Sequence, residues 1–238
     1  MKKISIYLSL LGIIFFCLDL VPVILPAIPN NSLVSLNNSL EIILLAPLMV
    51  IITYKIYKSF INTGNLDVNM RNLKFSFFSS VYAYIVGATM HFTANSIHAV
   101  YQEIESTNLI YIYDEYISHP LIFGPIFLIL IISCLIQVKF SLDENILKSS
   151  KIILGVSGGL LGFNLSLGSI EGQCPWVSWI FSIILIILCI YYNRKQKKKL
   201  AKNPAIYYGI IVSIITLIFL IIYLLIFGSY IQPSEFLL

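Results

Sequence analysis

Residues 205–230 read AIYYGIIVSIITLIFLIIYLLIFGSY and contain no charged side chain. A helix crosses the hydrocarbon core of a bilayer with about 20 apolar residues, so this run is long enough to span one. The whole chain of 238 residues has the same character, with 58% hydrophobic residues, 11% charged residues and a mean hydropathy of +0.91. Soluble domains carry about 25% charged residues. The apolar runs do not alternate with polar residues, and the sequence therefore predicts an all-α integral membrane protein.

Seven apolar segments predict a seven-transmembrane helix bundle that forms a single polytopic membrane domain over residues 1–238. The fourth segment could begin at Pro120, or near Ile110 with a kink, because proline disfavours helical geometry at the residue before it. The first segment follows two lysines, as in a signal peptide, but it is long, contains Asp19 and lacks a cleavage site, so we expect it to be uncleaved. The spans are expected at about 4–29, 40–61, 75–100, 110–138, 152–170, 175–192 and 205–230.

The charges predict the orientation of the bundle. All 15 lysines and arginines fall before the first span or beside the second, fourth and sixth connections between spans. The positive-inside rule makes that side cytoplasmic, which puts the N-terminus in the cytoplasm and the C-terminus outside. We therefore expect a multi-pass protein of the cell membrane. The basic run at 194–202 suits membrane lipids as partners and gives no reason to expect nucleic acid.

The stretch 89–119, TMHFTANSIHAVYQEIESTNLIYIYDEYISH, carries all 3 histidines of the chain. Its acidic residues are Glu103, Glu105, Asp114 and Glu115. Ionisable residues inside or at the edge of a membrane mark functional sites, because their desolvation must be compensated. We expect Glu103 and Glu105 to lie in a solvent-exposed loop. Asp114 and Glu115 could lie in such a loop or belong to a functional site.

One helical face of the third span is polar. His91, Asn95 and His98 recur on it at a spacing of three to four residues, and such a stripe should face the bundle interior or a water-filled cavity. At a rise of about 1.5 Å per residue, Asp19 lies at a depth close to that of His91. Glu171 ends the fifth span at the same outer boundary. These groups therefore share one layer of the membrane.

Imidazoles and carboxylates in one layer predict a divalent metal site, with zinc favoured and copper or iron as alternatives. The expected ligands are His91, His98, His119 and Asp19. The expected catalytic carboxylates are Glu115 and Asp114, while Asn95 and Glu171 would orient the ligands. If residues 110–119 are helical, Glu115 and His119 lie one turn apart, which suits two ligands or a ligand with its orienting carboxylate.

Bound metal acidifies water and a free carboxylate can act as general base, so the first functional hypothesis is a membrane-embedded, metal-dependent hydrolase. At the outer interface its substrate would be lipid-like. The second hypothesis is a copper- or haem-binding protein for electron transfer or metal handling, and the third is an accessory subunit of a membrane complex. Each histidine could instead be a buried or solvated imidazole without a ligand role.

Two further patterns concern the cysteines and the glycines. The 4 cysteines form no CxxC pair, which argues against a thiol redox motif and against a zinc knuckle. In the fifth span, Gly155 and Gly159 are four residues apart, as are Gly158, Gly162 and Ser166. This small-residue pattern predicts close contact with a neighbouring helix.

Overall fold

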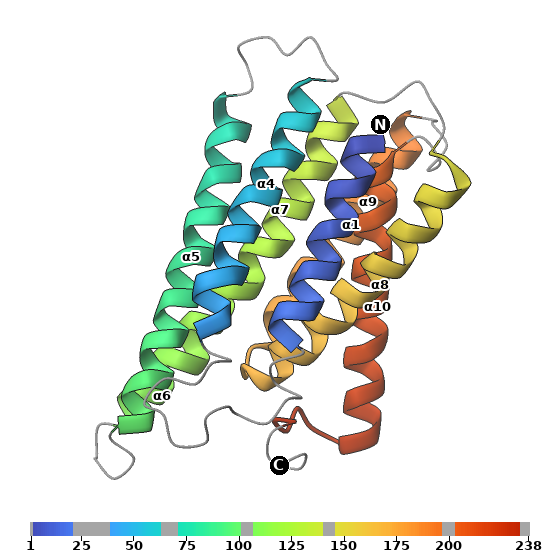
Figure 1. Cartoon of the computed structure of the whole chain (residues 1–238). Coiled ribbons are helices and arrows are strands. Elements are labelled where there is room, and N and C mark those ends of the chain that lie inside the picture. The colour runs from blue at the N-terminus through green and yellow to red at the C-terminus, as the bar shows by residue number, and fades with distance from the viewer. Residues whose placement is uncertain are drawn as a thin grey trace.

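The computed structural model describes residues 2–20, 39–62, 71–100, 107–139, 146–196 and 203–233. Every regular element in these ranges is helical, which confirms the all-α class, and the long helices lie side by side as a bundle (Figure 1). The elements are α1 (Lys2–Phe15), η1 (Phe16–Leu20), η2 (Glu41–Leu45), α4 (Ala46–Ile61), α5 (Arg71–Val100), α6 (Thr107–Tyr111), η4 (Ile112–Ser118), α7 (His119–Lys139), α8 (Lys148–Glu171), α9 (Pro175–Gln196) and α10 (Pro204–Phe227).

Five of the described helices are long and apolar enough to cross a membrane. They are Glu41–Ile61, Leu109–Val138, Lys148–Glu171, Pro175–Tyr192 and Pro204–Phe227. Each coincides with a span expected from the sequence. The other two expected spans correspond in position to α1 with η1 and to α5. Residues 21–29 of the first, together with Glu103, Glu105 and residues 197–202, lie outside the described ranges.

The outer surface of the bundle is apolar. Ile152 and Val156 of α8 and Leu225 and Ile226 of α10 are all more than half exposed. A soluble protein rarely leaves so much contiguous apolar surface in water. The same helices bury their other faces in a large hydrophobic core and in a smaller cluster of Ile170, Leu220 and Tyr223, so the exposed face is the one expected for contact with lipid.

The fourth expected span is a continuous helix from Thr107 to Lys139 in which Pro120 occupies an interior position. The turn before the proline, η4, is a π-helix, and the His119 N–H bonds to the carbonyl of Asp114 five residues earlier. Wider turns of this kind are common at functional sites and accommodate residues that an α-helix would not. Of the two starts that the sequence allowed, the structure has the earlier one.

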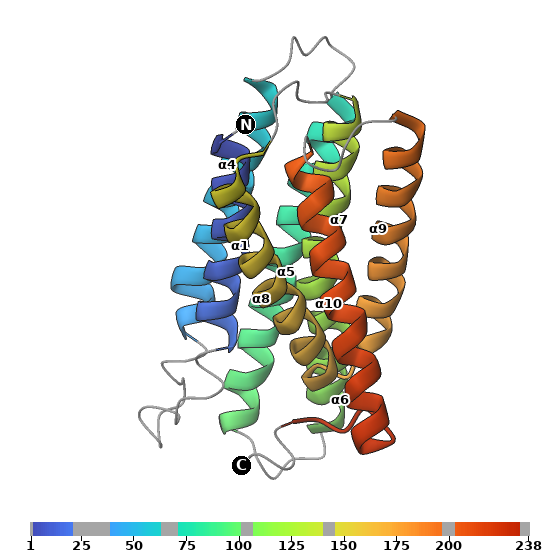
Figure 2. The same cartoon turned by 90° about the vertical axis from the view of Figure 1, so that its right-hand side faces the viewer.

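Small residues bring α8 against α10 and α1. A Cβ added to Gly162 would lie 2.5 Å from the Val212 carbonyl oxygen, and one added to Gly12 would overlap the backbone of Ser157. The predicted close contact is thus confirmed at Gly162, and also at Gly158, which packs on Tyr208. Gly159 has no heavy atom within 4 Å of an added Cβ. Figure 2 shows α8 crossing α1 and α10 obliquely.

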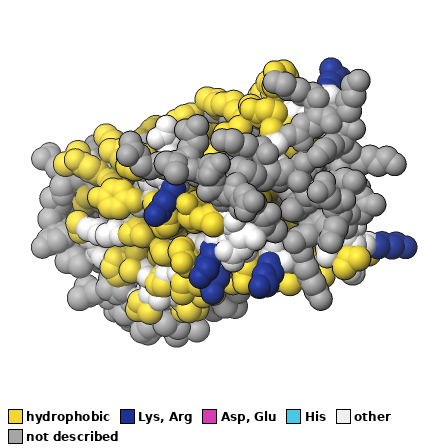
Figure 3. Space-filling model, turned by 90° about the horizontal axis from the view of Figure 1, so that it is seen from above, with side chains coloured by type: hydrophobic (Ala, Val, Ile, Leu, Met, Phe, Trp, Pro, Cys, Tyr) yellow, Lys and Arg dark blue, Asp and Glu magenta, His cyan; other side chains and the backbone are white. Residues whose placement is uncertain are grey.

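The two ends of the bundle differ in charge. At the top of Figure 1 lie three helix ends that carry lysines: the N-terminal ends of α1 and α8 and the C-terminal end of α4. Seen from that end, the coloured side chains include Lys and Arg but no Asp, Glu or His (Figure 3). The acidic residues that the structure describes lie toward the opposite end, where the candidate site is formed.

Candidate metal centre

Four separate parts of the chain contribute ionisable side chains to the end opposite the lysines. We call Asp19, Glu41, His91, Asp114, Glu115 and His119 the acid–histidine cluster. Asp19 lies in η1, Glu41 begins η2, and Asp114 and Glu115 lie in η4, so each acidic member sits in a π-helical turn. The side chains of Glu41, His91, Asp114, Glu115 and His119 are between 9% and 22% exposed. The cluster is therefore nearly buried in an otherwise apolar bundle.

His91 is held by two neighbours. Its Nδ1 lies 2.6 Å from Asp114 Oδ1, and its Nε2 lies 3.1 Å from Asn95 Nδ2. The carboxylate accepts the Nδ1 hydrogen, which leaves the Nε2 lone pair facing the donor amide of Asn95. Ser118 Oγ also donates to Asp114 Oδ1, at 3.2 Å. His91 Nδ1 and Asp114 Oδ1 are therefore neighbouring candidate ligand atoms, and Asn95 lies at the other ring nitrogen, the position of a group that orients a metal-binding histidine.

His119 is fixed by packing rather than by hydrogen bonds. Its ring stacks on Phe123 with an interplanar angle of 8°, and a side chain at Gly172 would overlap the ring. Its Nδ1 lies 3.2 Å from Glu115 Oε2, yet neither atom has a hydrogen-bond partner among the described residues. Buried polar atoms nearly always have a partner, so these two unbonded atoms are candidates for binding a ligand.

The two histidines and Asp114 form a group suited to an ion. One ligand atom from each of His91, Asp114 and His119 lies within 4.8 Å of the others, and the imidazole centroids are 4.6 Å apart. Two atoms that bind one zinc ion at 2.0–2.2 Å lie roughly 3.3 Å apart in tetrahedral geometry. His91 Nδ1 and Asp114 Oδ1 lie closer than this, at 2.6 Å, while the ligand atoms of all three residues lie within 4.8 Å of one another. The donor types are those of a divalent cation, and binding by all three residues requires their side chains to adjust.

Glu41 is a member that the sequence analysis did not include. Its Oε2 lies 3.9 Å from His91 Nε2, on the other side of the ring from Asp114. Because Glu41 is far from the histidines in sequence and sits at the start of an apolar run, only its position in the fold reveals it. Asp19, which the sequence did suggest, interacts electrostatically with both His91 and His119.

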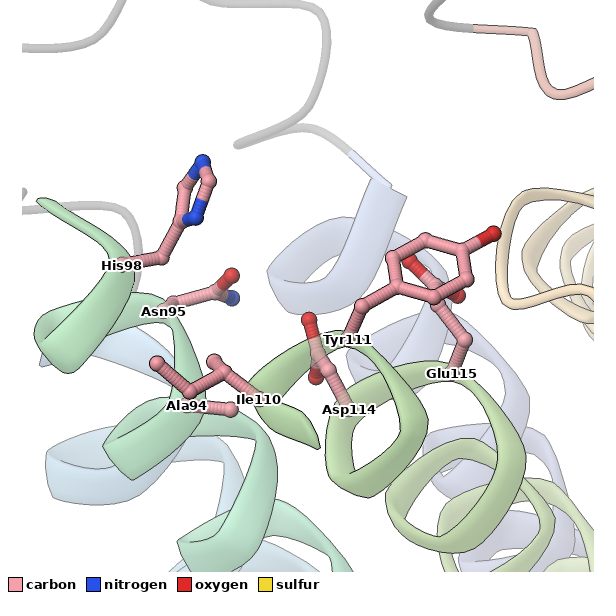
Figure 4. Close-up of a pocket in the computed structure, with 7 residues that line it drawn as sticks. All are labelled: Ala94, Asn95, His98, Ile110, Tyr111, Asp114 and Glu115. Carbon is pink, nitrogen blue, oxygen red and sulfur yellow. The ribbon is translucent and has the colours of Figure 1, made fainter. Parts of the chain in front are cut away.

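His98 is not brought into this group. It is exposed, and it lines a pocket of about 340 Å³ whose lining is Ala94, Asn95, His98, Ile110, Tyr111, Asp114 and Glu115. In Figure 4, His98 and Asn95 project from α5, while Tyr111, Asp114 and Glu115 project from the neighbouring helix. Asp114 and Glu115 thus belong both to the cluster and to the pocket. A molecule in the pocket would reach the cluster through these two carboxylates.

The segment after α10 returns to the site. Gln232 Nε2 donates to the Glu171 carbonyl oxygen at 2.7 Å and approaches Glu115 Oε1 at 3.3 Å. Glu171 therefore supports the site through its backbone.

Cys174 lies three residues after Glu171, and burial together with the nearby Glu115 charge raises the pKa of this thiol. A thiol held in its neutral form is a poor metal ligand, which leaves nitrogen and oxygen donors for the cluster.

The chain matches no known family model, curated protein or solved structure. The functional argument accordingly rests on the geometry of the acid–histidine cluster and its pocket.

Proposed function

We propose that this protein is a membrane-embedded, metal-dependent hydrolase that acts on a lipid-like substrate at the outer face of the cell membrane. One observation carries the proposal: His91, Asp114 and His119 bring ligand atoms within 4.8 Å of one another inside a bundle of apolar helices. Ionisable groups in such surroundings require compensation, and a divalent ion bound by nitrogen and oxygen supplies it. The proposed ion is zinc, with copper or iron as alternatives.

In this proposal the side chains of the chain have separate tasks. A bound divalent ion would polarise a carbonyl or phosphoryl oxygen and acidify water. His91, through Nδ1, would hold the ion together with Asp114 and His119, which leaves the imidazole proton on Nε2. Asn95, whose amide lies 3.1 Å from Nε2, would then orient the ring by accepting that proton through Oδ1. Glu115 lines the pocket and serves as the general base for the attacking water. Asp114 lines the pocket too, but it is a ligand in this proposal, so Glu115 is the carboxylate that is free to act as the base.

The volume of the pocket suits the part of a lipid that contains the bond to be cleaved, and it is too small for a whole lipid or a large soluble molecule. Its volume of about 340 Å³ is near the lower end for small-molecule sites, which is enough for a headgroup linkage. Leu109 and Ile112, on the helix that forms one wall, are 58% and 47% exposed. We propose that acyl chains lie along this apolar surface while an ester, amide or phosphoester bond enters the pocket.

The topology that we propose has seven spans, with the N-terminus in the cytoplasm and the C-terminus outside. The 30 residues of α5 reach about 45 Å at 1.5 Å per residue, which is enough to cross a bilayer. The lysines at one end of the bundle favour this orientation. A cysteine introduced at Ala201, in a background with Cys17→Ser, should react with a membrane-impermeant maleimide only after the cytoplasmic face is opened. Labelling of intact cells would reverse the orientation.

Haem is disfavoured as the alternative ligand. Two imidazoles that bind one haem iron lie on opposite faces of the porphyrin. The ring centroids of His91 and His119 are 4.6 Å apart and the rings contact each other, so no porphyrin fits between them. Copper fits the donor set, and an accessory subunit without any ligand remains the non-enzymatic alternative. The identity of the bound metal distinguishes the zinc hydrolase, the copper protein and the accessory subunit.

The first experiment is mass-spectrometric metal analysis of the detergent-purified protein, with His91→Ala and His98→Ala beside the wild type. We expect bound zinc that is lost in His91→Ala and kept in His98→Ala, because His98 is outside the ligand group. Vesicles that each contain one ester-, amide- or phosphoester-linked lipid then test hydrolysis. Copper would favour the redox alternative, and absence of any metal would leave the accessory role as the better account.

A further inference from the structure

With its four carboxylates ionised and its imidazoles neutral, the acid–histidine cluster carries more negative charge than one divalent ion can balance. Asp19, Glu41, Asp114 and Glu115 contribute four carboxylates, and no described lysine or arginine forms an ion pair with them. Ionised carboxylates in apolar surroundings are costly unless they are paired. One divalent ion leaves two of the four negative charges unbalanced when both imidazoles are neutral, whereas two divalent ions neutralise them.

The carboxylates are also divided between the two sides of His91. Asp114 lies 2.6 Å from Nδ1, whereas Glu41 lies 3.9 Å from Nε2. Glu41 also interacts electrostatically with Asp19, and the turns η1 and η2 that carry these two residues contact each other. A second group of oxygen donors therefore lies across the imidazole from Asp114.

A buried hydroxyl beside this second group has no partner. Tyr84 is 1% exposed, its Oη makes no hydrogen bond in the described residues, and it interacts electrostatically with Glu41 and Asp19. Such a hydroxyl needs an acceptor or a water. A hydrated ion held by Glu41 and Asp19 would provide either one.

We infer that the cluster holds two divalent cations, with Asp19 and Glu41 forming a second position beside the one formed by His91, Asp114 and His119. This inference rests on the proposed function and extends it from a one-ion site to a two-ion site. Neighbouring ions about 3.5–4 Å apart recur in enzymes that hydrolyse phosphoesters and amides. The alternative compensation is protonation of two carboxylic acids around a single ion.

The test is equilibrium dialysis of the full-length, metal-depleted protein in detergent against Zn²⁺, with the bound zinc counted by mass spectrometry. We expect about two equivalents in the wild type, and about one in Glu41→Gln and in Asp19→Asn. Glu144→Gln, a matched change in the sequence between α7 and α8, should keep both. Replacing Zn²⁺ by Mn²⁺ adds a spectroscopic measurement, because two neighbouring Mn²⁺ ions broaden each other's electron paramagnetic resonance signal and the Glu41→Gln variant should lose this broadening.

Folding is monitored separately by gel filtration and by thermal unfolding without metal. Removal of one carboxylate lowers repulsion in the metal-free cluster, so Glu41→Gln should unfold no earlier than the wild type, while the stabilisation by added Zn²⁺ shrinks. One equivalent in the wild type, unchanged in Glu41→Gln, overturns the second position and leaves the proposed hydrolase intact. Two equivalents in the wild type that Glu41→Gln and Asp19→Asn both keep also overturn the second position. If the wild type binds no zinc, both the second position and the metal-dependent hydrolase are overturned.

Discussion

Two sets of polar groups are buried in this bundle, and they are satisfied in different ways. Between α8 and α10, Thr216 donates to the carbonyls of Gly162 and Val212 at 3.0 and 2.9 Å, so helix backbones satisfy a neutral hydroxyl. In the acid–histidine cluster, His91 and Asp114 bond to each other at 2.6 Å, and His119 and Glu115 keep unbonded atoms. Thr216 is thus satisfied within the fold, whereas the cluster is left incomplete.

This difference separates packing from chemistry. A hydroxyl such as that of Thr216 can bond to a carbonyl of its own or the next helix, so it needs nothing from outside. An ionised carboxylate has only acceptors, and a neutral donor such as Ser118 Oγ beside Asp114 does not balance its charge, so it must be met by another ionisable group or by a ligand. Substitutions in the small-residue contact of α8 with α10 should therefore change stability alone, and those in the cluster should change ligand binding.

The largest effect on folding is expected from Gly162→Val. The added side chain would meet the Val212 carbonyl and Ile215, so α8 and α10 would have to separate, at a cost of about 3 kcal/mol. Thermal unfolding in detergent measures the loss. Gly159→Val is the matched control, because nothing lies within 4 Å of its Cβ. Equal destabilisation by both variants would show that this contact does not hold the two helices together.

His119→Gln should weaken zinc binding by more than about 100-fold while the protein still folds, because it removes a ligand that packing holds in place. The measurement is a competition titration with a chromogenic chelator. Thermal unfolding without metal should remain near that of the wild type. Zinc affinity within threefold of the wild type would remove His119 from the ligand set.

A smaller effect is expected for Asn95→Leu, which deletes the amide that bonds His91 Nε2 at 3.1 Å. Loss of a supporting hydrogen bond of this kind lowers metal affinity by roughly 10-fold. Thr93→Val provides the control, since among the described residues Thr93 bonds to the Thr89 carbonyl of its own helix, and it is exposed. The same chelator titration measures both variants, and an equal loss in the two would assign the effect to α5 as a whole.

The smallest effect is expected for Thr216→Val, which keeps the shape of the side chain and removes the hydroxyl. Hydrogen bonds between helices in membranes contribute about 0.6 kcal/mol on average. We expect a decrease of that size in the free energy of unfolding, with zinc affinity unchanged. A change in zinc affinity would contradict the separation of packing from ligand binding.

Much of the site could be predicted from the sequence because histidine and acidic residues are rare in apolar segments. That rarity pointed to His91, Asp114, Glu115 and His119, which the structure brings together. Their neighbour Glu41 could not be predicted, because it contacts His91 across about 50 residues of chain and sits at the edge of an ordinary span. The π-helical turns that carry the acids left no recognisable pattern in the sequence.

The sequence by itself determined the helical class, the approximate positions of the long helices and the separation of basic from acidic residues along them. These follow from local composition, because a bilayer requires long apolar helices and sorts charge by side. Only the tertiary structure decided which ionisable groups face each other. Helix rotation and tilt depend on close packing, such as that of Gly172 against the His119 ring, and a one-residue change in register would turn a ligand away from the cluster.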